Sequence, residues 1–130
     1  MNRRKTEDNH VTSDSLLLQL RADQSVAWHR FGTLYQPLVE GWCRRLGMDL
    51  SRSDDVYQEV LISVRRKIDS FRKDDTGQSF RKWLYTITRN KVNDHYRAAA
   101  KTPRATGGTG AWKQIENLPA EEPLQWQQGE

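Results

Sequence analysis

Large apolar residues recur at three- and four-residue steps along four stretches of the chain, and this spacing predicts four helices. The first stretch is short, and Ser13 or Asp14 can cap it. The second begins at Ser25 and is expected to end at Gly47, because glycine commonly terminates helices. Pro37 removes one backbone donor inside it, so we expect a kink in the preceding turn, with a break as the alternative. The apolar positions are Leu16, Leu17, Leu18, Leu20, Trp28, Phe31, Leu34, Tyr35, Leu38, Trp42 and Leu46.

The third and fourth stretches are separated by a polar turn at residues 72–78. The third follows a turn at residues 48–52, and Ser53 is its expected N-cap. The fourth is expected over residues 79–97, with Ser79 as its N-cap. Each carries an apolar stripe that requires a core. The stripes consist of Val56, Val60, Leu61, Val64, Ile68 and Phe71 in the third and of Phe80, Trp83, Leu84 and Ile87 in the fourth.

These elements predict an all-α fold, a compact bundle of about four helices over residues 13–100. A hydrophobic content of 35% is enough for a modest core of one small domain. Residues 1–12 are polar and are expected to form a disordered tail. Residues 101–130 are expected to be a flexible linker, because they begin with TPRATGGTGA and end in an acidic stretch with two prolines.

The polar side of the fourth stretch is strongly basic. Residues 81–104 contain seven basic residues and one acid, Asp94. Such a face suits a polyanion. Amides and rings lie among the cations and could hydrogen-bond to bases or stack on them. These residues are Tyr85, Asn90, Asn93 and His95. A solvated basic helix without a ligand is the alternative interpretation.

Composition argues against several classes of protein. The net charge of +4 favours an anionic partner, although the excess is concentrated in the middle of the chain. Cys43 is the only cysteine and cannot form an internal disulfide, so we expect it to be a packing residue. The sequence shows no signal peptide or long apolar run, which predicts a cytoplasmic protein without membrane insertion. The histidines and Cys43 have no metal-ligand spacing, and there is no glycine-rich phosphate loop. We therefore expect no cofactor, no metal and no catalytic residue.

The residues of the third and fourth stretches together resemble one family, the sigma factors of bacterial RNA polymerase. The similarity is to the second conserved region of the small extracytoplasmic-function (ECF) type, and it extends over residues 13–100. It implies an all-helical domain that binds the clamp helices of the largest subunit of core RNA polymerase. It also implies recognition of the minus-ten promoter element as the melted non-template strand. The resemblance is carried by Asp55, Gln58, Glu59, Phe71, Arg72, Asp74, Gly77, Ser79, Phe80, Arg81, Trp83, Leu84, Ile87, Arg89, Asn90, Asp94 and Arg97.

The resemblance implies a polymerase-binding surface at the start of the third helix, formed by Asp55, Gln58 and Glu59. Two carboxylates and an amide suit a basic coiled coil as partner. Acids in the first turns of a helix also complement its dipole, so stabilisation of the helix start is the alternative role.

A DNA-binding surface is implied at the start of the fourth helix and in the loop before it. The loop corresponds to one that, in the family, holds a base turned out of the stack, with a plain helix connector as the alternative. Asn90 corresponds to a position that helps to hold the melted strand, and the cations are expected to contact phosphates. Trp83 belongs to the packing stripe and is expected in the core rather than stacked on a base. The full set is Asp74, Asp75, Thr76, Gly77, Gln78, Ser79, Arg81, Lys82, Arg89, Asn90, Lys91 and Arg97.

The sequence departs from the family pattern at three places. Arg65 occupies a position where the family often has Trp, and Leu61 one where an aromatic residue is common. The family also has a second DNA-binding domain after the linker, whereas this chain ends at Glu130. The closing residues resemble the approach to that domain, so an excised piece is favoured over a naturally shortened protein. An anti-sigma protein is a further candidate partner.

Two other functions compete with this interpretation. A helical interaction module would regulate polymerase or another protein and bind DNA only without sequence preference. A helix-turn-helix repressor would read duplex DNA, but the fourth helix is longer than a recognition helix needs to be and no short turn precedes it.

Overall fold

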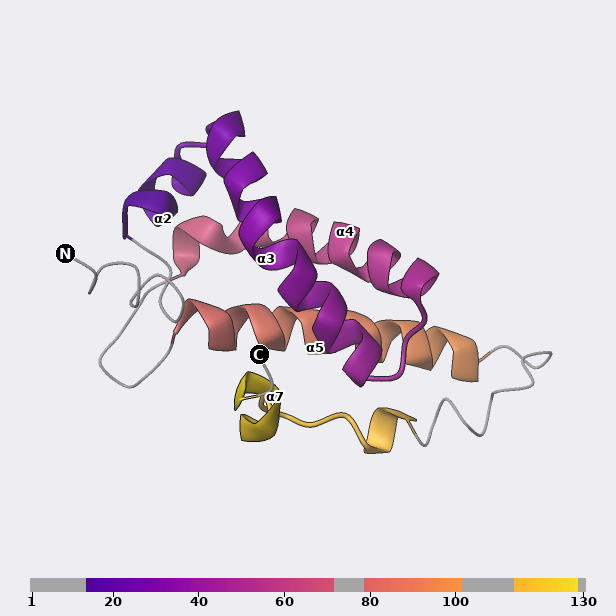
Figure 1. Ribbon diagram of the computed structural model, residues 1–130. Helices are drawn as coiled ribbons and strands as arrows, with labels where there is room; N and C mark the ends of the chain where they lie inside the picture. The colour runs from indigo at the N-terminus through magenta and orange to yellow at the C-terminus, as the bar shows by residue number, and fades with distance from the viewer. Residues whose placement is uncertain (1–13, 72–78, 102–113, 129–130) are drawn as a thin grey trace.

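The computed structural model describes residues 14–71, 79–101 and 114–128, and its regular structure in these ranges is helical throughout (Figure 1). This confirms the predicted all-α class. The helices are α2 (Asp14–Arg21), α3 (Ser25–Arg45), α4 (Leu50–Lys67), the short 3-10 turn η1 (Ile68–Ser70), α5 (Phe80–Ala100) and α7 (Leu124–Gln128).

Helices α3, α4 and α5 form the body of the domain, and each packs against the other two. In Figure 1, α4 and α5 run roughly side by side while α3 crosses both, and α2 packs on α3 and η1. The centre of the body is apolar, because every helix turns its stripe inward. Its fully buried members include Phe31, Val39, Val56, Val60, Val64, Leu84 and Val92.

Two leucines of the predicted stripes face solvent instead. Leu18 is 65% exposed and Leu34 is 55% exposed. Each has an apolar neighbour in sequence, Leu17 and Tyr35, which packs against the core. Consecutive residues on a helix point about 100° apart, so both members of such a pair cannot face a narrow core.

Helix α3 continues through Pro37 without a break and ends where the sequence indicated. Its C-cap is Leu46, and Gly47 follows with a positive φ of 98°. A side chain at Gly47 would also collide with Tyr96, since an added Cβ would lie 2.8 Å from the tyrosine oxygen. Glycine is required here by both backbone conformation and close packing.

The predicted start of α4 was wrong. The helix begins at Leu50, and its N-cap is Asp49, whose carboxylate accepts a hydrogen bond of 2.8 Å from the Arg52 amide. Ser53, the predicted cap, lies buried in the first turn and donates its hydroxyl to the Asp49 carbonyl at 2.7 Å. Leu50 is 68% exposed and lies outside the buried stripe of α4. The apolar pattern used to predict the helix therefore did not include its first turn.

The start of α5 agrees with the sequence. Ser79 caps the helix by accepting a hydrogen bond of 3.1 Å from the Lys82 amide. Phe80, Leu84 and Ile87 are buried, whereas Trp83 is partly buried and packs on the edge of the core. The Trp83 ring lies 4.9 Å from that of Phe71 and 5.4 Å from that of Phe80, measured between centroids. Its role in packing is thus peripheral.

Residues 114–128 lie against the helical body, within the segment that was expected to be a flexible linker (Figure 1). Leu118 is buried in the core, and Ile115 and Trp126 pack against it. Trp126 lies near Tyr85 of α5, with ring centroids 6.3 Å apart, and under the guanidinium of Arg45 of α3. Apolar anchors spaced along a polar segment hold it to the body.

Cys43 is fully buried between the helices, as its packing role predicted. Burial raises the pKa of its thiol to about 12, and the nearby Glu40 carboxylate adds to the effect. Within the described ranges, no helix is both long enough and apolar enough to cross a membrane.

The cap of α4 can be tested directly. We expect Asp49→Ala to lower the free energy of unfolding by about 1 kcal/mol, because the Arg52 amide loses its acceptor. Asp54→Ala, a change to an exposed residue of the same helix, is the control and should have a smaller effect. Urea unfolding followed by circular dichroism measures both. Equal effects of the two changes would contradict the assignment of Asp49 as the cap.

Candidate functional site

Helix α5 brings together all the predicted DNA contacts that lie in the described part of the chain. Asn90 and Arg97 are exposed, and the Lys82 side chain is 49% exposed. Arg81, Arg89 and Lys91 are partly buried. The loop residues Asp74, Asp75, Thr76, Gly77 and Gln78 lie outside the described residues, and Ser79 is engaged as the helix cap.

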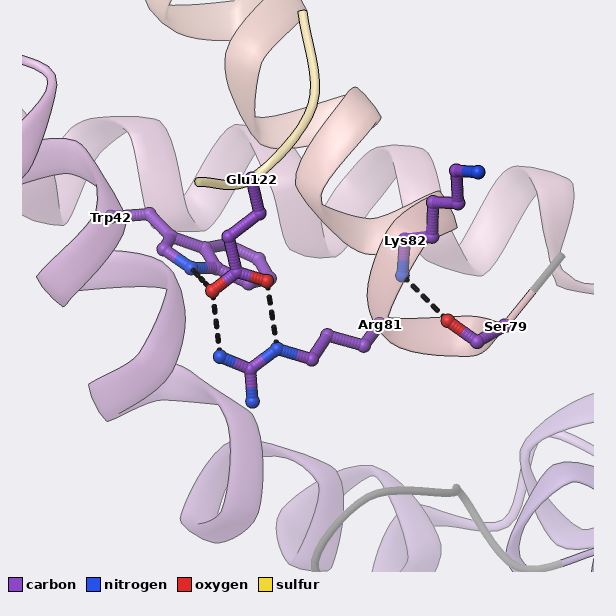
Figure 2. A network of polar contacts seen from close by, with 5 residues as sticks. All are labelled: Trp42, Ser79, Arg81, Lys82 and Glu122. Atoms are coloured by element: carbon purple, nitrogen blue, oxygen red, sulfur yellow. Dashed lines mark hydrogen bonds and ion pairs between the residues drawn. The ribbon is translucent and has the colours of Figure 1, made fainter. Parts of the chain in front are cut away.

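The Arg81 guanidinium is held by a carboxylate from the C-terminal segment (Figure 2). Its Nε donates to Glu122 Oε1 at 2.8 Å and its terminal nitrogen donates to Oε2 at 2.6 Å. The indole Nε1 of Trp42 donates to the same carboxylate at 2.8 Å. Glu122 retains only 7% of its side-chain exposure, so three N–H groups take the place of water around a nearly buried charge.

A second contact lies one to two turns further along α5. The Pro119 carbonyl accepts hydrogen bonds from Tyr85 Oη at 2.9 Å and from Arg89 Nε at 3.0 Å. Tyr85 had been expected to face outward among the cations, and that was wrong: it is buried, and its ring meets Trp42 edge-on with centroids 5.3 Å apart. Burial raises the pKa of Tyr85 to about 12; the Arg89 cation opposes this shift and the Glu122 carboxylate supports it.

The basic surface of α5 is therefore divided. Arg81 and Arg89 contact the C-terminal segment, and Lys82 lies 3.5 Å from Glu121 of the same segment. Further along, no hydrogen bond or ion pair joins the side chains of Asn90, Lys91 or Arg97 to another described residue. In this part of the helix, Asn90 and Arg97 are exposed and Lys91 is partly exposed.

The predicted polymerase-binding residues lie in the second and third turns of α4, because the helix begins at Leu50 and has no acidic residue in its first turn. Asp55 and Gln58 are exposed, as is the neighbouring Asp54. Glu59 differs, because its carboxylate lies 2.9 Å from Nε2 of His95 on α5. His95 had been grouped with residues that contact bases, but the structure pairs it with Glu59. This contact joins α4 to α5, whereas no such contact engages the exposed Asp54, Asp55 and Gln58 within the described residues.

Arg65, which departs from the family pattern, has a clear structural role. Its guanidinium lies 2.8 Å from the Asp23 carboxylate and 5.1 Å from the centroid of the Trp28 ring. It thereby connects α4 to the turn between α2 and α3. Both side chains of the ion pair are more than half exposed, so the pair contributes little to stability, and packing on the indole is its main effect.

No group of three or more His, Cys, Asp or Glu residues in the described ranges could hold a metal ion. The features that stand out are instead an acidic and amide surface on α4, a basic surface on α5, and an acidic segment lying on part of that basic surface.

Comparison with known proteins shows which family the chain belongs to. The family described as Sigma-70 region 2 matches residues 33–102, which include most of α3 and all of α4 and α5. The chain belongs to this family. Its relatives show that it is a region 2 domain of the ECF type. No solved structure shows a significant match to the chain.

Two curated relatives carry ECF sigma factor names. The ECF RNA polymerase sigma factor EcfG of Rhodopseudomonas palustris is 29% identical over 85 residues, which cover 65% of this chain and 45% of the relative. The ECF RNA polymerase sigma-E factor of Haemophilus influenzae is 32% identical over 96 residues, 72% of this chain and 47% of the relative. The chain thus spans about half the length of the curated relatives that it matches.

Sequence reasoning did not predict the contacts that residues 114–128 make with α3 and α5. Glu122, Pro119 and Trp42 were not predicted to be near the basic surface. One signal was available: two adjacent glutamates followed by a proline occur in a segment whose charge is opposite to that of α5. Opposite charge indicates that two segments can pair, but only the fold shows which atoms meet.

The ion pair between α5 and the C-terminal segment leads to a prediction. We expect Arg81→Lys to weaken docking of residues 114–128 by about 1.5 to 3 kcal/mol, because an ammonium cannot reproduce the two-bond fork to Glu122. Hydrogen exchange of amides protected by docking should then become about tenfold to a hundredfold faster. Lys82→Arg, a conservative change at an exposed neighbouring position, is the matched control. Unchanged exchange in the Arg81→Lys protein would show that the fork does not hold the segment.

Proposed function

We propose that this chain acts in transcription initiation by binding core RNA polymerase through α4 and the melted minus-ten promoter element through α5. The match to Sigma-70 region 2 is the observation that carries the proposal, because the matched residues include both surfaces. The names of the two relatives support the same role, since both are called ECF RNA polymerase sigma factors.

The polymerase contact is assigned to the N-terminal half of α4. Asp54, Asp55 and Gln58 are exposed there, and the body of the domain holds them on a rigid helix. Clamp helices that present basic side chains would form charge-assisted hydrogen bonds with these groups. Glu59 is assigned to the same surface. Its carboxylate also contacts His95, and this contact fixes α4 against α5.

The DNA contact is assigned to α5 and the loop before it. Lys91 and Arg97 would bind phosphates, and Asn90 would hydrogen-bond to the melted strand. Arg81, Lys82 and Arg89 extend this surface towards the N-terminus of the helix. The loop at residues 74–79 remains the predicted site for a base turned out of the stack. Phosphate contacts would set affinity and the loop would set specificity.

The polymerase surface can be tested by charge reversal. Asp55→Lys combined with Gln58→Ala should weaken binding to core RNA polymerase by on the order of 1 to 3 kcal/mol per strongly coupled contact, because a cation would face basic clamp helices. The affinity is measured by titrating the labelled chain with core enzyme.

The matched control for that experiment is Glu121→Lys, which reverses an exposed carboxylate near the N-terminus of α5 and should leave polymerase affinity unchanged. Circular dichroism checks that each protein is folded. An unaltered affinity of the double mutant would remove Asp55 and Gln58 from the polymerase surface.

The DNA surface predicts how affinity and specificity separate. In the presence of core polymerase, Lys91→Ala and Arg97→Ala should weaken binding to all single-stranded oligonucleotides alike and make the salt slope shallower by about 0.7 for each lost contact. Exchange of the loop at residues 74–78 for another turn of equal length should change the preferred base at one position and leave the salt slope unchanged.

Arg66→Ala, which removes an exposed cation from α4, serves as the control for net charge. An alanine mutant that alters base preference while the loop exchange does not would reverse the two assigned roles. Absence of any base preference in the parent would favour the interaction-module alternative.

A further inference from the structure

The C-terminal segment, residues 114–128, lies on the same arginines that are assigned to DNA. Glu122 binds Arg81 through two hydrogen bonds, and the Pro119 carbonyl binds Arg89. Glu121 lies 3.5 Å from Lys82. Three of the six charged or amide residues proposed for α5 are thus already in contact with one acidic segment of the same chain.

The contact with Arg81 has the geometry of phosphate recognition. A guanidinium presents two parallel N–H groups, and it binds a carboxylate and a phosphate in the same bidentate manner. Glu122 therefore occupies the Nε edge of the guanidinium, which is one of the two edges that a DNA phosphate could bind. The fork through Nε and this terminal nitrogen cannot serve both partners at once, so a phosphate that binds Arg81 in the same way has to displace Glu122.

The docked position is specific rather than a loose attraction of charges. Glu122 is almost completely buried, and the Trp42 indole donates to it from α3 as well. Leu118 is buried in the core four residues earlier. A carboxylate with three donors and an apolar anchor nearby define one register of the segment on α5 (Figure 2).

Solvent can still reach the edge of this contact. An open cavity of about 180 Å³ lies between the start of α5 and the segment, lined by Ser79, Arg81, Lys82, Glu121, Glu122 and Gln127. An incoming anion can approach Arg81 through this opening while Leu118 remains buried. Exchange of one anion for another can therefore begin without unfolding of the domain.

We propose that residues 114–128 are an intramolecular competitor of single-stranded DNA, in which Glu122 takes the place of a phosphate on Arg81. The docked segment lowers the affinity of the domain for DNA, and DNA binding releases the segment. This inference rests on the proposed function, since it assumes that α5 binds DNA. It adds that the free protein is held in a state of reduced DNA affinity by its own C-terminal segment.

The first test compares two glutamates of the segment in the full chain. Glu122→Gln removes the buried charge, whereas Glu116→Gln makes the same change in net charge at an exposed position of the same segment. A labelled oligothymidine is the probe, without polymerase. Glu122→Gln should bind it roughly tenfold more tightly than the parent, within the range typical of coupled sites. Glu116→Gln should differ from the parent by less than about twofold, as expected for an exposed charge.

A second variant separates release of the segment from the change in charge. Leu118→Asn removes the apolar anchor and leaves the net charge unaltered. It should also bind oligothymidine more tightly than the parent. Circular dichroism shows whether each variant retains the helical body, and hydrogen exchange shows whether residues 114–128 have been released.

A third measurement follows the segment in the parent protein. Saturating oligothymidine should accelerate hydrogen exchange of amides in residues 114–128, because bound phosphates displace Glu122. If the segment stays protected while DNA is bound, or if released variants bind DNA no more tightly than the parent, the competition does not exist. Base preference in the polymerase complex would then still support the proposed function. If neither the parent nor the released variants bind single-stranded DNA, with or without polymerase, the proposed function and this inference are both wrong.

Discussion

The structure depends on the division of α5 into two sides with opposite requirements. One side supplies Phe80, Leu84, Ile87 and Val92 to the core and must exclude water. The other side holds cations within a turn of those buried residues, and their charge has to be neutralised or solvated. The C-terminal segment satisfies this need for Arg81 and Arg89, while Lys91 and Arg97 remain towards solvent. The packing of α3 and α4 keeps both sides of the helix in place.

Periodicity was sufficient to predict α3, α4 and α5 because they are long and contribute several large residues each. It did not predict the short helix α7. It failed where the decisive atoms are polar or distant in sequence. The cap of α4 was assigned to Ser53 instead of Asp49. Leu50 in the first turn is exposed and is not part of the apolar stripe, so the stripe does not indicate where the helix begins. Tyr85 was placed outside because it is not part of the stripe of Phe80, Leu84 and Ile87. The Pro119 carbonyl nevertheless lets its phenol be buried with its hydrogen bond satisfied.

The candidate site was only partly predictable for the same reason. Asp55, Gln58, Asn90 and Arg97 are exposed, as residues available to partners should be. Their assigned contacts with polymerase and DNA remain proposals. The pairing of His95 with Glu59, and of Arg81 with Glu122, joins residues 36 and 41 positions apart. Helical spacing carries no information about such pairs, because it describes one helix at a time.

The far end of α5 has a mechanical consequence for the domain. Tyr96 donates a buried hydrogen bond of 2.8 Å to the Leu46 carbonyl, at the corner where α3 turns into α4, and the contact of His95 with Glu59 lies beside it. Gly47 allows the tyrosine to approach this corner closely. The helix proposed to hold the promoter strand is thus fastened to the helix proposed to hold the polymerase. In the proposed complex, these contacts would keep the polymerase-binding surface of α4 and the DNA-binding surface of α5 at a fixed separation. The packing of the protein, rather than the DNA, would then set the distance between the polymerase and the promoter strand.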